Sequence, residues 1–197
     1  MKPVRVTMFA FVFCMFVVGL PEYGLAQPAN DECAGAFAIS SLPYSLNQNT
    51  RLATANPGDP VLTCADGGGG KTVWFTYIPD STRVVKISTL GSTPSDYDIA
   101  LAVFTGACGS LVEVRCNDDA GGTRQSEIFM QVNAGVTYII HVGEWAGGGP
   151  GGGVPTGGDL VFNVMVGQPP PVVRGPKNGS VPSGVSITTD GFPLAPA

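Results

Sequence analysis

The stretch that most constrains the fold runs from Ser95 to Asp119. Two apolar runs, Ile99–Phe104 and Leu111–Cys116, flank a turn that contains Gly106 and Gly109. Short apolar runs bounded by Gly, Ser and Asp are typical of a β-hairpin. We therefore expect two antiparallel strands here, and a fold in which the other strands pack around this hairpin.

The open end of the predicted hairpin is rich in side-chain oxygens. If Phe104 lies opposite Leu111, Asp98 faces Asn117 across the strands, and one loop edge gathers the side chains of Asp96, Asp98, Asn117, Asp118 and Asp119. Carboxylates this close repel one another unless a cation lies between them. Calcium is the usual cation for such an oxygen cluster. A solvated acidic loop, closed by Asp and Asn turn chemistry, is the alternative, and both interpretations stay open.

The first residues predict export. Lys2 and Arg5 precede an apolar run, Met8–Leu20, and Gly24-Leu25-Ala26 provides small residues before a cleavage point. This order is that of a secretory signal peptide, here residues 1–26. The apolar run falls short of the ~20 residues that a membrane-spanning helix needs, so we expect a secreted protein, extracellular or periplasmic, without a membrane anchor.

The charge balance argues against two classes of partner. Loss of Lys2, Arg5 and Glu22 with the leader leaves 8 basic and 14 acidic residues. An acidic chain without a Lys/Arg cluster cannot neutralise phosphates, so nucleic acid is not an expected partner. Electrostatic docking on anionic lipid is disfavoured for the same reason.

Four cysteines remain after the leader is removed: Cys33, Cys64, Cys108 and Cys116. An even number in an exported domain predicts two disulfides, with three connectivities. Our first choice is Cys33–Cys64 with Cys108–Cys116. The second of these pairs is difficult in a flat hairpin, because several residues at ~3.3 Å each exceed the ~7 Å limit between bridged Cα atoms. The hairpin is then irregular, or the pairing is different.

The rest of the chain reads as short strands separated by turns. Beside the hairpin, the predicted strands are Ala36–Ile39, Tyr44–Leu46, Thr72–Ile78, Val84–Thr89, Ile128–Val132, Thr137–Val142 and Asp159–Val166. No segment has a convincing helical pattern. The fold class is therefore all-β: a jelly-roll-like antiparallel β-sandwich of about seven to nine short strands.

Composition sets the expected domain limits. The sandwich occupies residues 27–166, and residues 167–197 read as a Pro/Gly-rich linker or disordered tail. Within the domain, Gly143–Gly158 contains GGGPGGG, and we expect a floppy surface insertion because fixing glycine costs the most backbone entropy.

Several motifs resemble the bacterial pre-peptidase C-terminal domain family, in its secreted, cysteine-containing members. They are NDEC, TVWFTYIP, DYDIALAVFTGACGSL, VRCNDD and AGVTYIIHVG, in this order between Asn30 and Val166. The resemblance implies a non-catalytic jelly-roll-like sandwich of the kind appended to exported enzymes. Many members carry two further cysteines, near Leu90 and Gly121, and both are absent here.

The resemblance also implies ligands. Some members bind calcium through acidic residues of the N-terminal segment together with loop carboxylates. Asn30, Asp31 and Glu32 match the first group in this sequence, and the carboxylates of the hairpin end are candidates for the second. Other members bind fibrous substrates such as collagen.

An enzyme is not expected. His141 is the only histidine, and its place between Ile140 and Val142 on a strand suggests an outward-facing polar residue. A Ser-His-Asp site needs a nucleophile within reach of the histidine, and the sequence has no GxSxG motif. Two carboxylates such as Asp98 and Asp118 can in principle hydrolyse glycosides, so a hydrolase remains a remote alternative.

Two non-catalytic functions remain. The first is a binding module for an extracellular polymer, peptide or cell-surface ligand, with exposed aromatic side chains such as Trp74, Tyr97 and Trp145 on a shallow face. The second is a purely structural domain of an exported surface protein, which predicts that the aromatic side chains are buried. The sequence does not indicate an oligomeric state.

Overall fold

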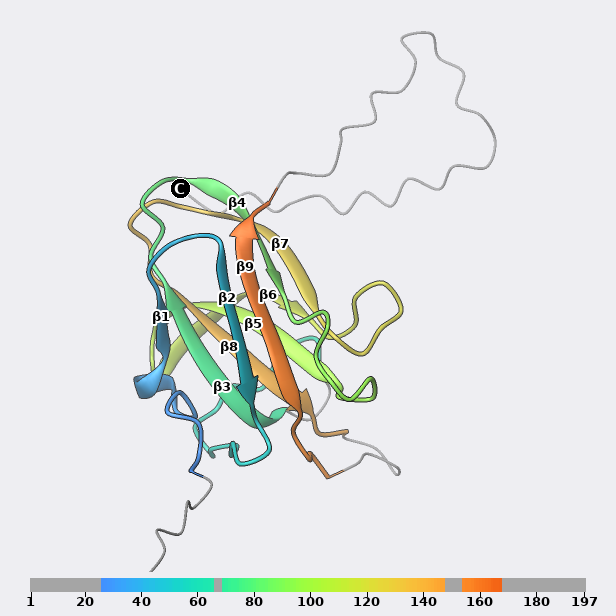
Figure 1. Cartoon of the computed structure of the whole chain (residues 1–197). Coiled ribbons are helices and arrows are strands. Elements are labelled where there is room, and N and C mark those ends of the chain that lie inside the picture. The colour runs from blue at the N-terminus through green and yellow to red at the C-terminus, as the bar shows by residue number, and fades with distance from the viewer. Residues whose placement is uncertain (1–25, 66–68, 148–153, 168–197) are drawn as a thin grey trace, which may run out of the picture.

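The computed structural model describes residues 26–65, 69–147 and 154–167, which form two facing β-sheets (Figure 1). A short 3-10 helix, η1, spans Cys33–Gly35. The strands of the described residues are β1 (Phe37–Ile39), β2 (Tyr44–Asn49), β3 (Gly69–Tyr77), β4 (Arg83–Ser88), β5 (Ile99–Ala107), β6 (Ser110–Asn117), β7 (Glu127–Val132), β8 (Tyr138–Trp145) and β9 (Asp159–Val166). The predicted all-β sandwich is confirmed.

The two sheets differ in size. The five-stranded sheet has the order β1-β3-β8-β5-β6, and the four-stranded sheet has the order β2-β9-β4-β7. All neighbouring strands are antiparallel except β1 and β3. From β1 to β9 the chain moves to the other sheet at every connection except the β5–β6 hairpin. The sheets are therefore joined at both ends by the chain itself.

The main core lies between the sheets. Phe75 of β3 stacks on Phe162 of β9, with ring centroids 3.9 Å apart, so this contact joins the two layers directly. Around this pair lie buried side chains from both sheets, among them Val73, Ile87, Leu101, Ile128, Ile140 and Val164. Burial of these apolar side chains stabilises the fold by about 1.5–3 kcal/mol for each large residue.

The outer face of the five-stranded sheet is also buried. Its side chains form a second hydrophobic cluster, which we call the outer-face cluster. Trp74, Ala100, Ala102, Phe104 and Ile139 of the sheet pack with Leu62 and Ala65 of the β2–β3 connection. Cys33, the first residue of η1, and Ala36, which follows η1, pack against the same cluster. We call the residues that cover this face, 33–36 and 62–65, the covering segments. Strands β3, β5 and β8 are therefore buried on both faces.

The hairpin has a different register from the predicted one. Gly106, not Phe104, lies opposite Leu111, and Asn117 lies opposite Leu101 rather than Asp98. Two features cause the difference. Gly106 and Gly109 have positive φ, which lets β5 continue to Ala107 before a two-residue turn. A bulge between Val103 and Phe104 then shifts the register toward the open end.

The predicted glycine-rich insertion is shorter than expected. Strand β8 continues to Trp145, and Gly157 and Gly158 are buried at the other end of the segment. Thr50 N donates to Gly158 O (2.9 Å), and Gly158 N donates to Thr50 Oγ1 (3.0 Å). A side chain at Gly158 would place its Cβ 2.4 Å from Tyr97 Cδ1, so glycine is needed for this close contact.

Other predictions fall outside the described residues: most of the signal peptide, the GGGPGGG motif except Gly147, and the tail after Gly167. Within the described ranges, no helix has the length and apolar character that crossing a membrane requires.

Candidate functional site

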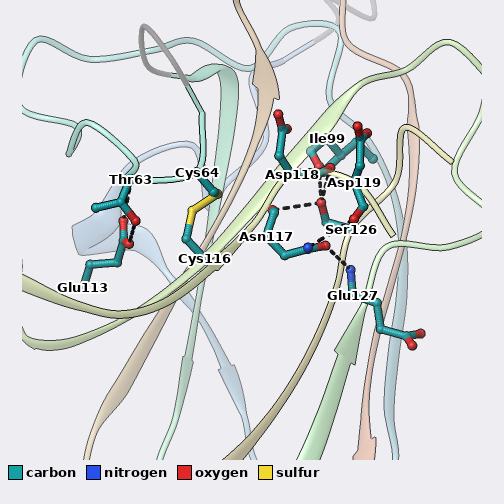
Figure 2. Close-up of a disulfide and its surroundings, with 10 residues drawn as sticks. All are labelled: Thr63, Cys64, Ile99, Glu113, Cys116, Asn117, Asp118, Asp119, Ser126 and Glu127. Carbon is teal, nitrogen blue, oxygen red and sulfur yellow. Dashed lines mark hydrogen bonds between the residues drawn. A yellow bond between two sulfur atoms is a disulfide. The ribbon is translucent and has the colours of Figure 1, made fainter. Parts of the chain in front are cut away.

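Two disulfides fasten the covering segments to the hairpin. The bridges are Cys33–Cys108 and Cys64–Cys116, with Cα–Cα distances of 5.9 and 5.6 Å. The predicted disulfides are present, but the first-choice pairing was wrong. Cys108 lies in the turn and Cys116 near the far end of β6, so each bonds to a covering segment instead of to the other. Thr63, next to Cys64, also donates hydrogen bonds to the Glu113 carboxylate of β6 (Figure 2).

The outer-face cluster contains the histidine that we expected at the surface. Trp74 and His141 lie opposite each other in the β3–β8 ladder, and both side chains are fully buried. The expectation for His141 was wrong because its strand is covered on both faces. Its ring nitrogens have no hydrogen-bond partner among the described residues, and burial lowers the pKa of the imidazole to about 4. Trp74, expected in a ligand-binding surface, is buried for the same reason.

The predicted acidic edge is organised by a buried serine. Ser126 Oγ lies 2.5 Å from Ile99 O, 2.9 Å from Asn117 O and 2.6 Å from Asp118 O (Figure 2). The amide of Asn117 accepts from Glu127 N (3.0 Å) and donates to Asp119 O (3.2 Å). These contacts join the ends of β5, β6 and β7. Asn117, Asp118 and Asp119 are thus held through their backbone carbonyls, and Asn117 also through its side-chain amide.

The charges at this edge are unfavourably placed for Asp98. Its pKa is raised, first by burial and then by the nearby negative charge of Asp119, while Arg124 at 3.7 Å lowers it. Glu144 contributes a further small repulsion. Asp96 is exposed. The structure therefore brings Asp98 and Asp119 together, as predicted, although the strand register is different.

The N-terminal acidic residues have structural partners. Asn30 is fully buried; its Nδ2 donates to Trp74 O (3.0 Å), and its Oδ1 accepts from Gln48 Nε2 (2.5 Å). Asp31 accepts from Thr54 N and Thr54 Oγ1, both at 2.6 Å. Glu32 is exposed. Asn30 and Asp31 therefore fix the N-terminal segment against β3 and the β2–β3 connection.

The predicted calcium ligands do not fit a single site. The segment before β1 and the β6–β7 connection lie on opposite sides of the sandwich (Figure 1). Among the described residues, no group of three or more His, Cys, Asp or Glu side chains is arranged to hold a metal ion. Calcium binding therefore stays a prediction, because the proposed ligands do not converge on one position.

The other two predicted ligand-binding aromatics are not on an open face either. Tyr97 is buried, and its hydroxyl lies 2.7 Å from Thr50 Oγ1. Burial raises the pKa of this tyrosine to about 12. Trp145 is half-buried and packs against the outer-face cluster. These three aromatic side chains are therefore used for packing.

The structure instead shows a groove with both polar and apolar lining groups at one end of the four-stranded sheet. It has a volume of about 290 Å³ and is lined by Asn47, Gln48, Asn49, Thr93, Asp159, Leu160 and Val161. Asn47 and Asn49 lie opposite Val161 and Asp159 in the β2–β9 ladder. Thr93 forms a β-bridge with Asp159 on the other side of β9. Sequence reasoning missed this groove, because Thr93 lies in a loop far along the chain from β2.

The only carboxylate in the groove lining belongs to Asp159, and its negative charge is balanced by an ion pair. Arg51 Nη1 and Nη2 donate to the two carboxylate oxygens of Asp159, at 2.9 and 3.2 Å. Asn49 Nδ2 donates to the same group (2.7 Å). Arg51 and Asn49 hold the pKa of Asp159 below its ordinary value, so this carboxylate stays ionised and paired.

Comparison with known proteins gives similarity of structure only. No protein-family model matches the chain, and no curated protein is similar enough to count as a relative. The pre-peptidase C-terminal domain of a collagenase from Bacillus anthracis is 12% identical, with a TM-score of 0.42, covering 66% of this chain and 94% of that domain. A GH26-CBM35 β-(1,4)-mannanase from Podospora anserina is 17% identical, with a TM-score of 0.29, covering 65% of this chain and 29% of the mannanase.

Proposed function

We propose that this chain is an exported, non-catalytic accessory module that holds an extracellular polymer, peptide or cell-surface ligand on the outer face of its four-stranded sheet. The observation that carries the proposal is the difference between the two outer faces. The covering segments and both disulfides close the outer face of the five-stranded sheet. Among the described residues, no segment lies across β2 and β9 on the outer face of the other sheet (Figure 1).

The open face has the composition of a contact surface. Its side chains follow from the strand registers: every second residue of β2, β9, β4 and β7 points away from the core. They include Ser45, Asn47, Asn49, Asp159, Val161, Asn163, Met165, Lys86, Glu127, Phe129 and Gln131. Lys86 pairs with Glu127 (2.5 Å), so this face presents amide, hydroxyl and apolar groups and little unbalanced charge.

The state of the histidine supports a non-catalytic role. His141 is the only histidine in the sequence, and its ring is fully enclosed in the outer-face cluster. A general base must come within hydrogen-bond reach of the group that it deprotonates. An enclosed imidazole with a pKa of about 4 does not meet this condition for an external substrate.

The cysteines support export. All four cysteines of the predicted exported chain form disulfides, and such bonds persist in oxidising compartments outside the cytosol. Direct evidence would come from the processed N-terminus. Expression of the full chain with its leader should give a product in the periplasm or medium whose first residue is Gln27.

The proposed binding is tested by measuring how much protein insoluble polymers remove from solution. The exported full-length product is mixed with suspensions of cellulose, chitin, insoluble xylan, collagen fibres and bacterial cell walls, and the protein left in solution is measured. We expect depletion by at least one polymer and none by an inert resin such as cross-linked agarose. Equal recovery from every suspension would reject the binding role.

A second candidate function is a structural domain of an exported surface protein. The burial of Trp74 and Tyr97 favours it, because a binding module that uses aromatic side chains would expose them. In that case the depletion experiment gives no binding, while the oxidised protein remains stably folded.

A further inference from the structure

The groove at the end of the open sheet face indicates what kind of polymer the module would hold. This inference rests on the proposed binding function and adds the chemical class of the ligand. Three features of the groove carry it: its charge balance, its unpaired hydrogen-bonding groups and its apolar floor.

One wall of the groove and part of its floor consist of Thr93, Asp159 and Asn49, which lie side by side on three neighbouring segments. Thr93 and Asp159 exchange two backbone hydrogen bonds, of 3.0 and 2.8 Å, and Asp159 lies opposite Asn49 on β2. The Asp159 carboxylate is occupied by Arg51 and Asn49. A charged ligand would therefore find no unbalanced charge in the lining, and an ionic polymer gains no counter-charge here.

The remaining hydrogen-bonding side chains of the groove are uncharged and can both donate and accept hydrogen bonds. The side chains of Asn47 and Thr93 are exposed, and neither makes a hydrogen bond with another described residue. The Asn amide offers donors and an acceptor, and the Thr hydroxyl can be either. Hydroxyl-rich ligands need such partners, because each sugar hydroxyl both donates and accepts.

The floor supplies one partly exposed apolar side chain, that of Val161. Val161 is half-buried between Asn47 and the loop that contains Gly91. Ser92 Oγ accepts from Val161 N (2.9 Å), which holds that loop, and with it Thr93, at the side of β9. The volume of about 290 Å³ is at the small end for ligand pockets, which suits one or two sugar rings of a chain that continues along the sheet.

We propose that this groove binds a neutral, hydroxyl-rich polysaccharide segment. Asn47 and Thr93 bind its hydroxyl groups, and Val161 contacts the C–H surface of a ring. No aromatic residue lines the groove, so each contact is weak, and binding depends on repetition of the unit along the polymer.

The test measures soluble neutral polysaccharides, namely glucomannan, arabinoxylan, laminarin and dextran, by affinity gel electrophoresis of the full chain. Alginate and poly-lysine serve as charged probes, and triple-helical collagen peptides serve as the protein probe. We expect retardation by at least one neutral polysaccharide. Asn47→Ala and Thr93→Val should each weaken it about three- to tenfold, the value of one hydrogen bond.

Ser110→Ala is the control. Ser110 is exposed on β6, a strand of the five-stranded sheet, and lies outside both the groove and the open face. It should leave retardation unchanged. Melting temperatures of all three variants show whether a loss of binding reflects a loss of folding.

The outcomes separate this inference from the proposed function. Binding to collagen, cell walls or a charged polymer without binding to any neutral polysaccharide would overturn the inference and leave the binding module in place. Neutral binding that Asn47→Ala and Thr93→Val do not weaken would place the ligand elsewhere and also overturn it. Failure to bind any polymer would reject both.

Discussion

The ring of Trp74 meets the ring of His141 edge to face, with centroids 4.6 Å apart and an angle of 77° between the planes. Neither side chain is exposed, and Trp74 Nε1 and both His141 nitrogens have no hydrogen-bond partner among the described residues. Buried polar groups without partners cost stability, and a charged imidazole at this position costs more. The outer-face cluster therefore tolerates a neutral histidine and opposes a protonated one.

Acid should destabilise the domain through His141. Its pKa is about 4 in the folded state, against an ordinary value of 6.5 in the unfolded chain. Between these values the unfolded state binds more protons, so the free energy of unfolding falls as the pH drops from about 6.5 toward 4. The expected loss is about 3 kcal/mol, measured as urea unfolding at several pH values.

The matched variant is His141→Leu, which removes the titrating group. The comparison uses the pH dependence of its unfolding free energy and not its stability at a single pH. The prediction is that its unfolding free energy changes less between pH 6.5 and 4 than that of the original chain. Parallel profiles for the two proteins would mean that another group causes the pH dependence.

The disulfide pairing can be read directly from a digest. Cleavage after Lys and Arg places each cysteine in its own peptide: 27–51, 52–71, 87–115 and 116–124. Mass spectrometry of the unreduced digest should show 27–51 joined to 87–115, and 52–71 joined to 116–124. A joined pair of 27–51 and 52–71 would contradict the structure.

Asp98→Asn tests the acidic edge. The pKa of Asp98 is higher in the folded than in the unfolded state, so its favourable contribution is lost as the pH rises through the folded pKa. At pH 7 the ionised group is therefore unfavourable, and its neutralisation should raise the melting temperature slightly, on the order of 1 °C.

If Asp98 is a calcium ligand, Asp98→Asn should lower the melting temperature in the presence of calcium instead of raising it. We expect the same small increase in calcium and in chelator. A decrease that occurs in calcium alone would identify Asp98 as a metal ligand, and a melting temperature of the original chain that rises with calcium would support the predicted site.

Tyr97→Phe separates packing from binding. Removal of the hydroxyl deletes the 2.7 Å hydrogen bond to Thr50 Oγ1, which keeps its hydrogen bonds with Gly158, and should cost about 1 kcal/mol of stability. Retardation by polysaccharide should not change, since Tyr97 does not line the groove. Weaker binding at unchanged stability would show instead that Tyr97 contacts the ligand.

Local patterns predicted the strands well. Short apolar runs between turn residues located the nine strands of the described residues to within a few positions, because side-chain alternation and Gly or Pro turns are local properties. The register of the β5–β6 hairpin was wrong because it depends on a bulge at Val103/Phe104. The sequence gives no local signal for that bulge.

The site residues were harder to predict because they depend on distant segments. His141 is a polar residue between Ile140 and Val142, which suggested an outward position, and only the covering segments, fastened by Cys33 and Cys64, enclose it. The groove likewise needs Thr93 to lie beside Asp159, 66 positions later in the chain. Contacts of this kind follow from topology and not from periodicity.

The order of the paired cysteines along the chain has one more consequence. The bridge from Cys33 to Cys108 and the bridge from Cys64 to Cys116 overlap in sequence, so each closes a loop that contains one end of the other. A single peptide-bond cleavage anywhere between Cys33 and Cys116 leaves the two fragments covalently joined by at least one bridge. Outside the cell, where proteases are common, a copy of this domain cut once in this interval would not separate into two chains.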